Sequence, residues 1–220
     1  MDGFIEIIMR TLLRLPAFLI AISVHECAHG YAAYKMGDPT AKYSGRLSLN
    51  PLAHFDLIGG LCLLFFSFGW AKPVPVNPYN FKDRKKGTII VSLAGPFSNF
   101  VVAVISAFLC AFTLKYVGYS CLAPLSELNG VEFLFPIFQY CMLLNIGLMI
   151  FNLIPIPPLD GSKVLMEFLP YKAREVMYQL ERYSMLVLIL LIYTGALDGI
   201  LMFLQEGVFE IIMLLLKPFF

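Results

Sequence analysis

Residues 17–34, AFLIAISVHECAHGYAAY, place three ionisable side chains inside a run that is otherwise largely apolar. They are His25, Glu26 and His29. An apolar run of this length predicts a helix in a bilayer, where ionisable groups cost free energy and usually have a function. Residues four apart share one face of a helix, so the two imidazoles can bind one metal ion.

Glu26 directly follows the first histidine, as in the H-E-x-x-H pattern of zinc-dependent hydrolases. In that pattern the glutamate is the general base that acts on a water molecule beside the metal. The alternative is a histidine pair that only makes hydrogen bonds between helices. That alternative leaves Glu26 without a task, so we favour a zinc site with Glu26 as its catalytic residue.

Composition indicates a membrane protein. Hydrophobic residues make up 59% of the 220 residues and charged residues 14%, whereas soluble domains have about 45–50% and about 25%. The net charge is +1, and no basic patch is interleaved with aromatic residues in a polar context, so no nucleic-acid partner is expected. We expect one domain over residues 1–220.

Four apolar segments are long enough to cross a bilayer, which takes about 20 residues. They are residues 4–35, 88–115, 131–154 and 185–204. A shorter apolar stretch, residues 57–70, is expected to be re-entrant. Residues 205–220 are expected to lie in the membrane interface or against the bundle.

Two polar, turn-rich runs, residues 41–56 and 71–87, flank the re-entrant segment. Their prolines and their β-branched or alternating residues predict short strands near the membrane surface. We therefore expect an all-α polytopic membrane protein with about four spans, a re-entrant segment and a small membrane-associated β-hairpin or sheet.

The basic residues predict the orientation. Twelve of the 16 lie in residues 35–87 and 155–182, which share one side of a four-span chain. Cytoplasmic loops carry an excess of Lys and Arg. That side is therefore expected to be the cytoplasm, with both termini outside and the histidine pair toward the cytoplasmic side.

A catalytic zinc ion needs a third protein ligand. His54 is one candidate, because it lies in a polar loop 25 residues after His29. Asp160 is the other, because it follows a proline-broken run that ends the third span on the same side as His29. Asp160 would serve equally well as a cap of the helix that follows it. The residues alone leave this choice open.

His25-Glu26-x-x-His29 and Asp160-Gly161 resemble the two motifs of the site-2 protease family of intramembrane zinc metalloproteases. Further stretches resemble its compact bacterial and archaeal members in the same order: residues 37–41, 45–51, 69–78 and 94–99. The resemblance implies one Zn²⁺ per chain, held by His25, His29 and Asp160, and so favours Asp160 over His54. The loop 118–130 is too short for the peptide-binding or nucleotide-binding domain that many relatives carry.

The resemblance also implies an activity. Family members hydrolyse peptide bonds within or next to transmembrane segments of single-span or other membrane-protein substrates. The family has an asparagine at the position of Asn152, with an implied role in binding substrate or the oxyanion; a helix–helix hydrogen bond is the alternative. Residues 41–50 or 74–80 would pair with an unwound substrate by strand addition, or would merely pack over the site.

The main alternative function is a membrane metal-binding or transport protein that uses the same ligands. A transporter usually shows an internal repeat, and none is visible in the sequence. A catalytically inactive relative that only binds membrane partners is a third reading. Glu26 has no obvious task in either case, which favours the protease.

Overall fold

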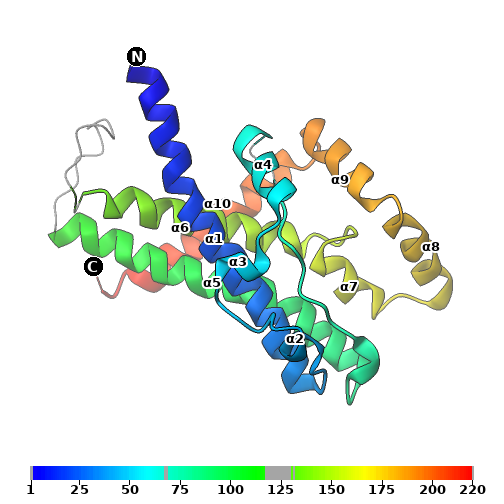
Figure 1. Ribbon diagram of the computed structural model, residues 1–220. Helices are drawn as coiled ribbons and strands as arrows, with labels where there is room; N and C mark the ends of the chain where they lie inside the picture. Colours follow the sequence, from blue (N-terminus) through cyan, green and yellow to red (C-terminus); the bar gives the residue numbers. More distant parts are fainter. Residues whose placement is uncertain (1, 67–68, 117–129, 131, 220) are drawn as a thin grey trace.

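The computed structural model describes residues 2–66, 69–116, 130 and 132–219, and every regular element among them is helical (Figure 1). The long helices are α1 (Asp2–Met36), α5 (Arg84–Tyr116), α6 (Leu134–Leu153) and α10 (Asp198–Leu216). The short ones are α2 (Thr40–Tyr43), α3 (Pro51–His54), α4 (Leu57–Phe66), the 3-10 turn η1 (Pro78–Asn80), α7 (Asp160–Met166), α8 (Tyr171–Glu181) and α9 (Ser184–Tyr193). Of the short loop 118–130, only Gly130 lies within the described residues.

Three of the described helices, α5, α6 and α10, are long and apolar enough to cross a membrane. The pair α8 and α9, bent by 74°, makes a fourth if it counts as one span. The all-α membrane class is therefore confirmed, and α5 and α6 match two of the expected spans. Helix α1 covers the expected first span and continues through Pro16; its passage through the bilayer stays a prediction.

The expected fourth span, residues 185–204, is wrong as one helix. Helix α9 ends at Tyr193, and Gly195 follows with φ +66°. The Gly195 N–H donates to Ile192 and the Ala196 N–H to Leu191, which is the hydrogen-bond pattern of a Schellman helix end. The expected interfacial tail, residues 205–220, belongs mostly to α10, which is itself a candidate span.

The expected β-hairpin or sheet is also wrong, since the described residues contain no strand. Residues 41–56 contain most of α2 and all of α3, with turns and bends between them. Pro51 occupies the first turn of α3, and the Asn50 side chain accepts a hydrogen bond from the Leu52 N–H. Proline at this position and an asparagine cap both start helices, and they outweigh the turn signals that suggested strands.

The segment 71–77 has no regular secondary structure, and the elements around it bind its backbone. The Lys72 N–H donates to the His54 carbonyl at 2.9 Å. The Val74 N–H donates to the Glu26 carboxylate and the Asn77 N–H to the Asp38 carboxylate, both at 2.7 Å. These three donors are therefore satisfied without a partner strand.

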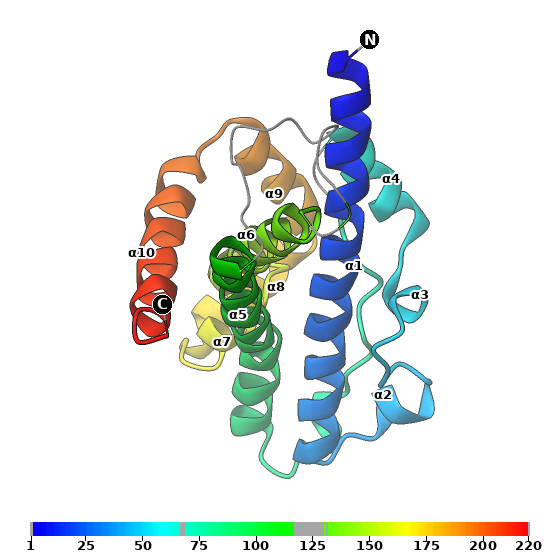
Figure 2. The same ribbon diagram turned by 90° about the vertical axis from the view of Figure 1, so that its left-hand side faces the viewer.

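Helices α5 and α6 run antiparallel side by side, and α1 packs against both (Figures 1 and 2). Helix α10 covers α5 and α6 on another side. The shared core of these three helices consists of Ala103, Ala107, Met142, Ile146, Ile150, Ile212 and Leu216. Ala33 of α1 packs with Phe81 and with Val91 of α5. This packing turns the histidine face of α1 toward α5.

Candidate metal centre

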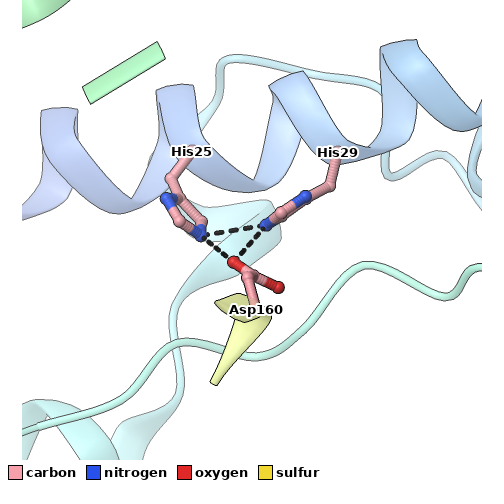
Figure 3. A group of neighbouring side chains, drawn as sticks. All are labelled: His25, His29 and Asp160. Carbon is pink, nitrogen blue, oxygen red and sulfur yellow. Dashed lines mark hydrogen bonds and ion pairs between the residues drawn. The ribbon is translucent and has the colours of Figure 1, made fainter. Parts of the chain in front are cut away.

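Three side chains that could hold a metal ion converge between α1 and α7 (Figure 3). His25 and His29 project from successive turns of α1, and their Nε2 atoms are 2.9 Å apart. Asp160, the first residue of α7, places its Oδ2 atom 3.3 Å from Nε2 of His25 and 3.0 Å from Nε2 of His29. None of the three residues is more than 9% exposed.

Hydrogen bonds on the far side of each ring determine which nitrogen carries the proton. The Nδ1 atom of His29 lies 2.7 Å from the carbonyl oxygen of Val91, which can only accept. The Nδ1 atom of His25 lies 2.6 Å from the side-chain oxygen of Asn99, also an acceptor. Both Nδ1 atoms are therefore protonated, so each ring, when neutral, has an unprotonated Nε2 that faces Asp160.

In that state three lone-pair atoms lie this close together, and a cation between them would remove their repulsion. A tetrahedral zinc ion with bonds of about 2.0–2.1 Å has ligand atoms about 3.3 Å apart. The separations of 2.9, 3.0 and 3.3 Å are close to that spacing. Two imidazole nitrogens and one carboxylate oxygen also form a ligand set found in catalytic zinc sites. The residues therefore fit Zn²⁺.

Asp160 reaches the histidines because the chain leaves the helical path after α6. Helix α6 ends at Leu153, and residues 154–159 are turns and bends. Gly161 then packs so closely against the carbonyl groups of Leu153 and Ile154 that a Cβ atom would overlap them. The Lys163 ammonium lies 3.2 Å from Oδ1 of Asp160, which leaves Oδ2 for the metal.

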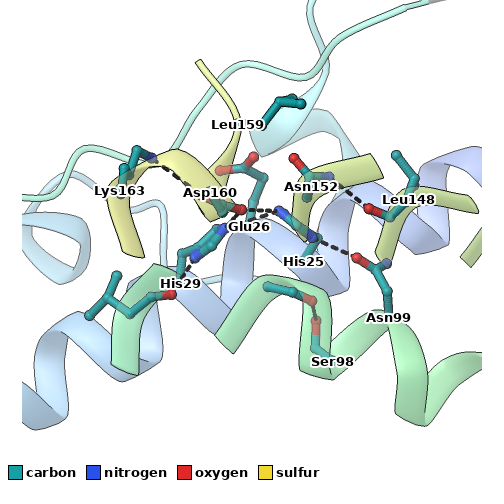
Figure 4. A network of polar contacts seen from close by, with 12 residues as sticks. His25, Glu26, His29, Ser98, Asn99, Leu148, Asn152, Leu159, Asp160 and Lys163 are labelled. Atoms are coloured by element: carbon teal, nitrogen blue, oxygen red, sulfur yellow. Dashed lines mark hydrogen bonds and ion pairs between the residues drawn. The ribbon is translucent and has the colours of Figure 1, made fainter. Parts of the chain in front are cut away.

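Glu26 lies beside the three candidate ligands (Figure 4). All four side chains line a cavity of about 550 Å³. Its Oε2 atom accepts the hydrogen bond from the Val74 N–H. The cavity wall is largely apolar and includes Phe18, Ile22, Trp70, Val76, Leu148 and Phe151. An apolar wall lowers the local dielectric constant and strengthens the electrostatic interactions inside the cavity.

Asn152 lines the same cavity, and one N–H of its amide donates to the Leu148 carbonyl at 3.0 Å (Figure 4).

His54, the other candidate for the third ligand, lies outside this site. Its ring is fully buried, and its Nε2 donates to the Ser48 carbonyl at 2.7 Å. His54 belongs neither to the metal-binding group nor to the cavity wall. The fold thus brings Asp160, and not His54, to the histidine pair.

Two residues near the centre were missed by the sequence analysis. Asn145 accepts a hydrogen bond from Asn99 at 2.7 Å, and Lys163 pairs with Asp160. The available signal for Asn145 was an amide in the apolar run 134–153, which also contains Gln139 and Asn152, since polar groups at membrane depth are costly. The signal for Lys163 was its position one helical turn after an acidic residue.

Comparison with known families bears directly on this centre. The sequence model of Peptidase family M50 matches residues 14–194, a range that contains the two histidines, Glu26 and Asp160. The chain belongs to this family. Family M50 is the site-2 protease family, so the resemblance seen in the sequence motifs is confirmed.

Several M50 relatives bear the names of zinc metalloproteases. One is "Putative zinc metalloprotease YwhC" of Bacillus subtilis (strain 168), 42% identical over 176 residues, which are 80% of this chain and 78% of that protein. Rip2 of Mycolicibacterium smegmatis is 29% identical over 193 residues, covering 85% of this chain and 69% of Rip2. Rip2 of Mycobacterium tuberculosis (strain H37Rv) is 26% identical over 193 residues, covering 84% and 68%. No solved structure matches the chain. The family and the ligand geometry together identify this M50 chain as a zinc metalloprotease.

Proposed function

We propose that the chain is an intramembrane endopeptidase that hydrolyses peptide bonds within or next to transmembrane segments of membrane proteins. The observation that carries the proposal is a single cavity. The acid Glu26, the two histidines and Asp160 all line it, and its walls come in part from α1 and from the candidate span α6. A peptide bond that reaches this cavity must enter between helices that a bilayer surrounds. We place the protein in the cell membrane, with the cavity toward the cytoplasm.

In the proposed mechanism, His25, His29 and Asp160 hold the zinc ion. When bound, zinc lowers the pKa of a water molecule and polarises the peptide carbonyl. Glu26 is the general base: it accepts the proton of the attacking water and delivers it to the leaving amine. The Val74 N–H holds Oε2 of Glu26. No other donor in the described part of the chain binds this carboxylate, so Oε1 remains available for the proton.

Asn152 is proposed to assist the oxyanion. One N–H of its amide is bound to the Leu148 carbonyl, which fixes the orientation of the side chain. The amide has a second N–H, and this donor would stabilise the negative charge that develops on the carbonyl oxygen of the substrate.

The substrate must present an extended backbone, because the carbonyl groups of an intact helix are hydrogen-bonded and shielded. We expect helix-breaking residues near the scissile bond to speed cleavage. Of the expected range 74–80, residues 74–77 are proposed to pair with the unwound substrate by strand addition, because residues 78–80 form η1. Residues 41–50 lose that role, because their first part is helical in α2.

Purified Glu26→Gln protein tests the proposal. Cleavage of a single-span substrate should fall by about 10²–10⁴-fold, the contribution expected of a general base, while the zinc content per chain stays that of the wild type. Glu175→Gln on the exposed side of α8 is the matched control and should retain full activity.

Undiminished cleavage by Glu26→Gln would refute the role of Glu26. Zinc binding without cleavage of any substrate in a panel of single-span proteins would instead favour a metal-binding or transport protein.

A further inference from the structure

A chain of buried amides links the zinc ligand His25 to helix α6. The His25 Nδ1–H donates to the side-chain oxygen of Asn99 at 2.6 Å (Figure 4). The Asn99 Nδ2 atom donates to the side-chain oxygen of Asn145 at 2.7 Å, and Nδ2 of Asn145 donates to the Cys141 carbonyl at 2.8 Å. Asn99 and Asn145 are both 0% exposed, so these bonds are shielded from bulk water.

Backbone carbonyls determine the direction of every bond in this chain. The carbonyl of Cys141 can only accept, so the amide nitrogen of Asn145 must face it and the amide oxygen must face Asn99. The second N–H of Asn99 donates to the Ala21 carbonyl at 3.2 Å. Both hydrogens of Asn99 Nδ2 are therefore committed, and the Asn99 oxygen has to face His25. This arrangement requires His25 to carry a proton on Nδ1, and Nε2 is then the ring nitrogen that can bind the metal.

The two histidine ligands differ in what supports them. His29 donates to the Val91 carbonyl, a backbone group that no substitution removes. His25 depends on a side chain, Asn99, whose own orientation depends on a second side chain, Asn145. The position of His25 is thus sensitive to substitutions in α5 and α6, although neither asparagine touches the atoms that bind zinc.

We infer that Asn99 and Asn145 are positioning residues for the zinc centre: Asn99 fixes the tautomer and ring orientation of His25, and Asn145 fixes the orientation of Asn99. The inference concerns the zinc site of the proposed protease, but zinc affinity is measured without any substrate. It can therefore fail while the protease function stands, and it can hold if no cleavage is ever found.

Three variants and a control test the inference. Asn99→Leu and Asn145→Leu keep a side chain of similar size but remove the amide, and Asn99→Leu/Asn145→Leu combines them. Ser98→Ala is the control, because the Ser98 hydroxyl donates only to the Gly95 carbonyl within its own helix (Figure 4). The Kd for Zn²⁺ is measured in detergent by competition with a chelator.

Asn99→Leu should weaken zinc binding by about 10–100-fold, the usual effect of losing a group that orients a metal ligand. Asn145→Leu should weaken it by a smaller factor, and the double variant should match Asn99→Leu because Asn145 acts only through Asn99. Ser98→Ala should bind as the wild type does. A Kd for Asn99→Leu within twofold of wild type would overturn the inference. If the zinc affinity of the double variant falls by the product of the two single factors, Asn145 does not act through Asn99, and that part of the inference is overturned.

A spectroscopic readout separates positioning from general damage. The visible spectrum of the Co²⁺-substituted protein should change in Asn99→Leu and stay unchanged in Ser98→Ala, because it reports the ligand geometry. Hydrogen bonds between membrane helices contribute modestly to stability, so the metal-free variants should unfold near the wild-type temperature. If Asn99→Leu does not fold, Asn145→Leu still decides the matter, because wild-type affinity and an unchanged Co²⁺ spectrum in that variant would overturn the inference.

Discussion

Gly95 shows how little space the proposed zinc ligands leave on the α5 side. A Cβ atom at this position would overlap Nε2 of His29 as well as Cε1 and Nε2 of His25. Close-packed interiors do not absorb such an overlap without movement. In Gly95→Ala the two imidazoles should therefore separate, and zinc affinity should fall by at least about tenfold.

The measurement is the Zn²⁺ Kd of the purified variant. Gly207→Ala in α10 is the matched control, since a Cβ atom there meets nothing within 4 Å. If Gly95→Ala binds zinc as tightly as the wild type, then α5 lies farther from the two imidazoles than it does in the structure.

The proposed third ligand, Asp160, gives a second prediction at the residue scale. Asp160→Asn preserves the shape of the side chain but removes its charge, so zinc affinity should fall by more than the roughly 100-fold that a lost supporting contact can cost. His54→Ala should lower the thermal stability, because His54 is fully buried, but should leave the zinc content unchanged. Loss of zinc in His54→Ala with retention in Asp160→Asn would reverse the assignment.

At the scale of the elements, Asp38 anchors the segment 71–77. Its fully buried carboxylate accepts hydrogen bonds from the backbone of Thr40 and Asn77 and from the side chains of Thr40 and Asn80. Burial acts to raise the pKa of Asp38, but these hydrogen bonds outweigh it and hold the pKa below its ordinary value. Asp38 thereby ties the end of α1 to the segment that contacts Glu26 through Val74.

Asp38→Asn should lower the free energy of unfolding by about 1–3 kcal/mol, because one buried acceptor is replaced by a donor. The folded-state pKa lies below the unfolded one, so the stabilisation is complete above the unfolded pKa and is lost as the pH falls through the folded pKa. The stability difference from wild type should thus be constant from about pH 5 to pH 8 and should narrow below about pH 4.

Thermal unfolding across this pH range provides the measurement. Asp83→Asn is the control: it is an exposed helix cap that keeps an acceptor oxygen for the Lys86 N–H. An Asp38→Asn protein with wild-type stability at pH 7 would show that the segment is held by its other contacts.

Local signals explain which elements could be predicted from the sequence. The i, i+4 spacing of His25 and His29 and the proline run before Asp160 act within one turn or one loop, and the structure brings these residues together. The helix end at Gly195 also has a local signal, the glycine itself, but the apolar content of residues 185–204 taken as a whole does not show it. The partner of Asn145 lies 46 residues away, and no property of the sequence near Asn145 specifies that partner.

The segment 71–77 shows what local residue types cannot predict. A strand was expected there, but the segment has no regular secondary structure in the described part of the chain. A strand needs a partner for its backbone groups, and here Glu26, Asp38 and the end of α3 supply the partners. Local residue types report backbone conformation, but they do not report which group will satisfy a backbone donor.

At the scale of the whole molecule, apolar side chains also cover the outside of the bundle. The outward face of α5 exposes Ile90, Leu93, Phe97, Val101, Ile105, Phe108 and Phe112. Helix α10 similarly exposes Ile200, Met202, Phe203, Ile211 and Leu214. Contiguous apolar surfaces of this extent require an apolar surrounding, and lipid is the surrounding that these candidate spans fit.

The packing also relates the two termini. His29 contacts Val91 and His25 contacts Asn99, so α1 runs antiparallel to α5 and its N-terminus lies toward the Tyr116 end. The Phe219 ring lies 6.0 Å from the Phe108 ring, so the C-terminal end of α10 is near the same end of α5. Both termini should therefore lie on one side of the membrane, opposite the basic loops, which are expected to be cytoplasmic.

Single cysteines in a background without the five native cysteines test this topology. A membrane-impermeant maleimide added to intact cells should label Tyr116→Cys and Lys217→Cys but not Tyr43→Cys, and the pattern should invert in inside-out vesicles. All three native side chains are exposed, so access is limited by the membrane and not by the fold. If Lys217→Cys is labelled in the same preparation as Tyr43→Cys, and not with Tyr116→Cys, then α10 crosses the membrane in the opposite direction. That result contradicts the Phe108–Phe219 contact, because an end of α10 on the cytoplasmic side cannot reach the far end of α5.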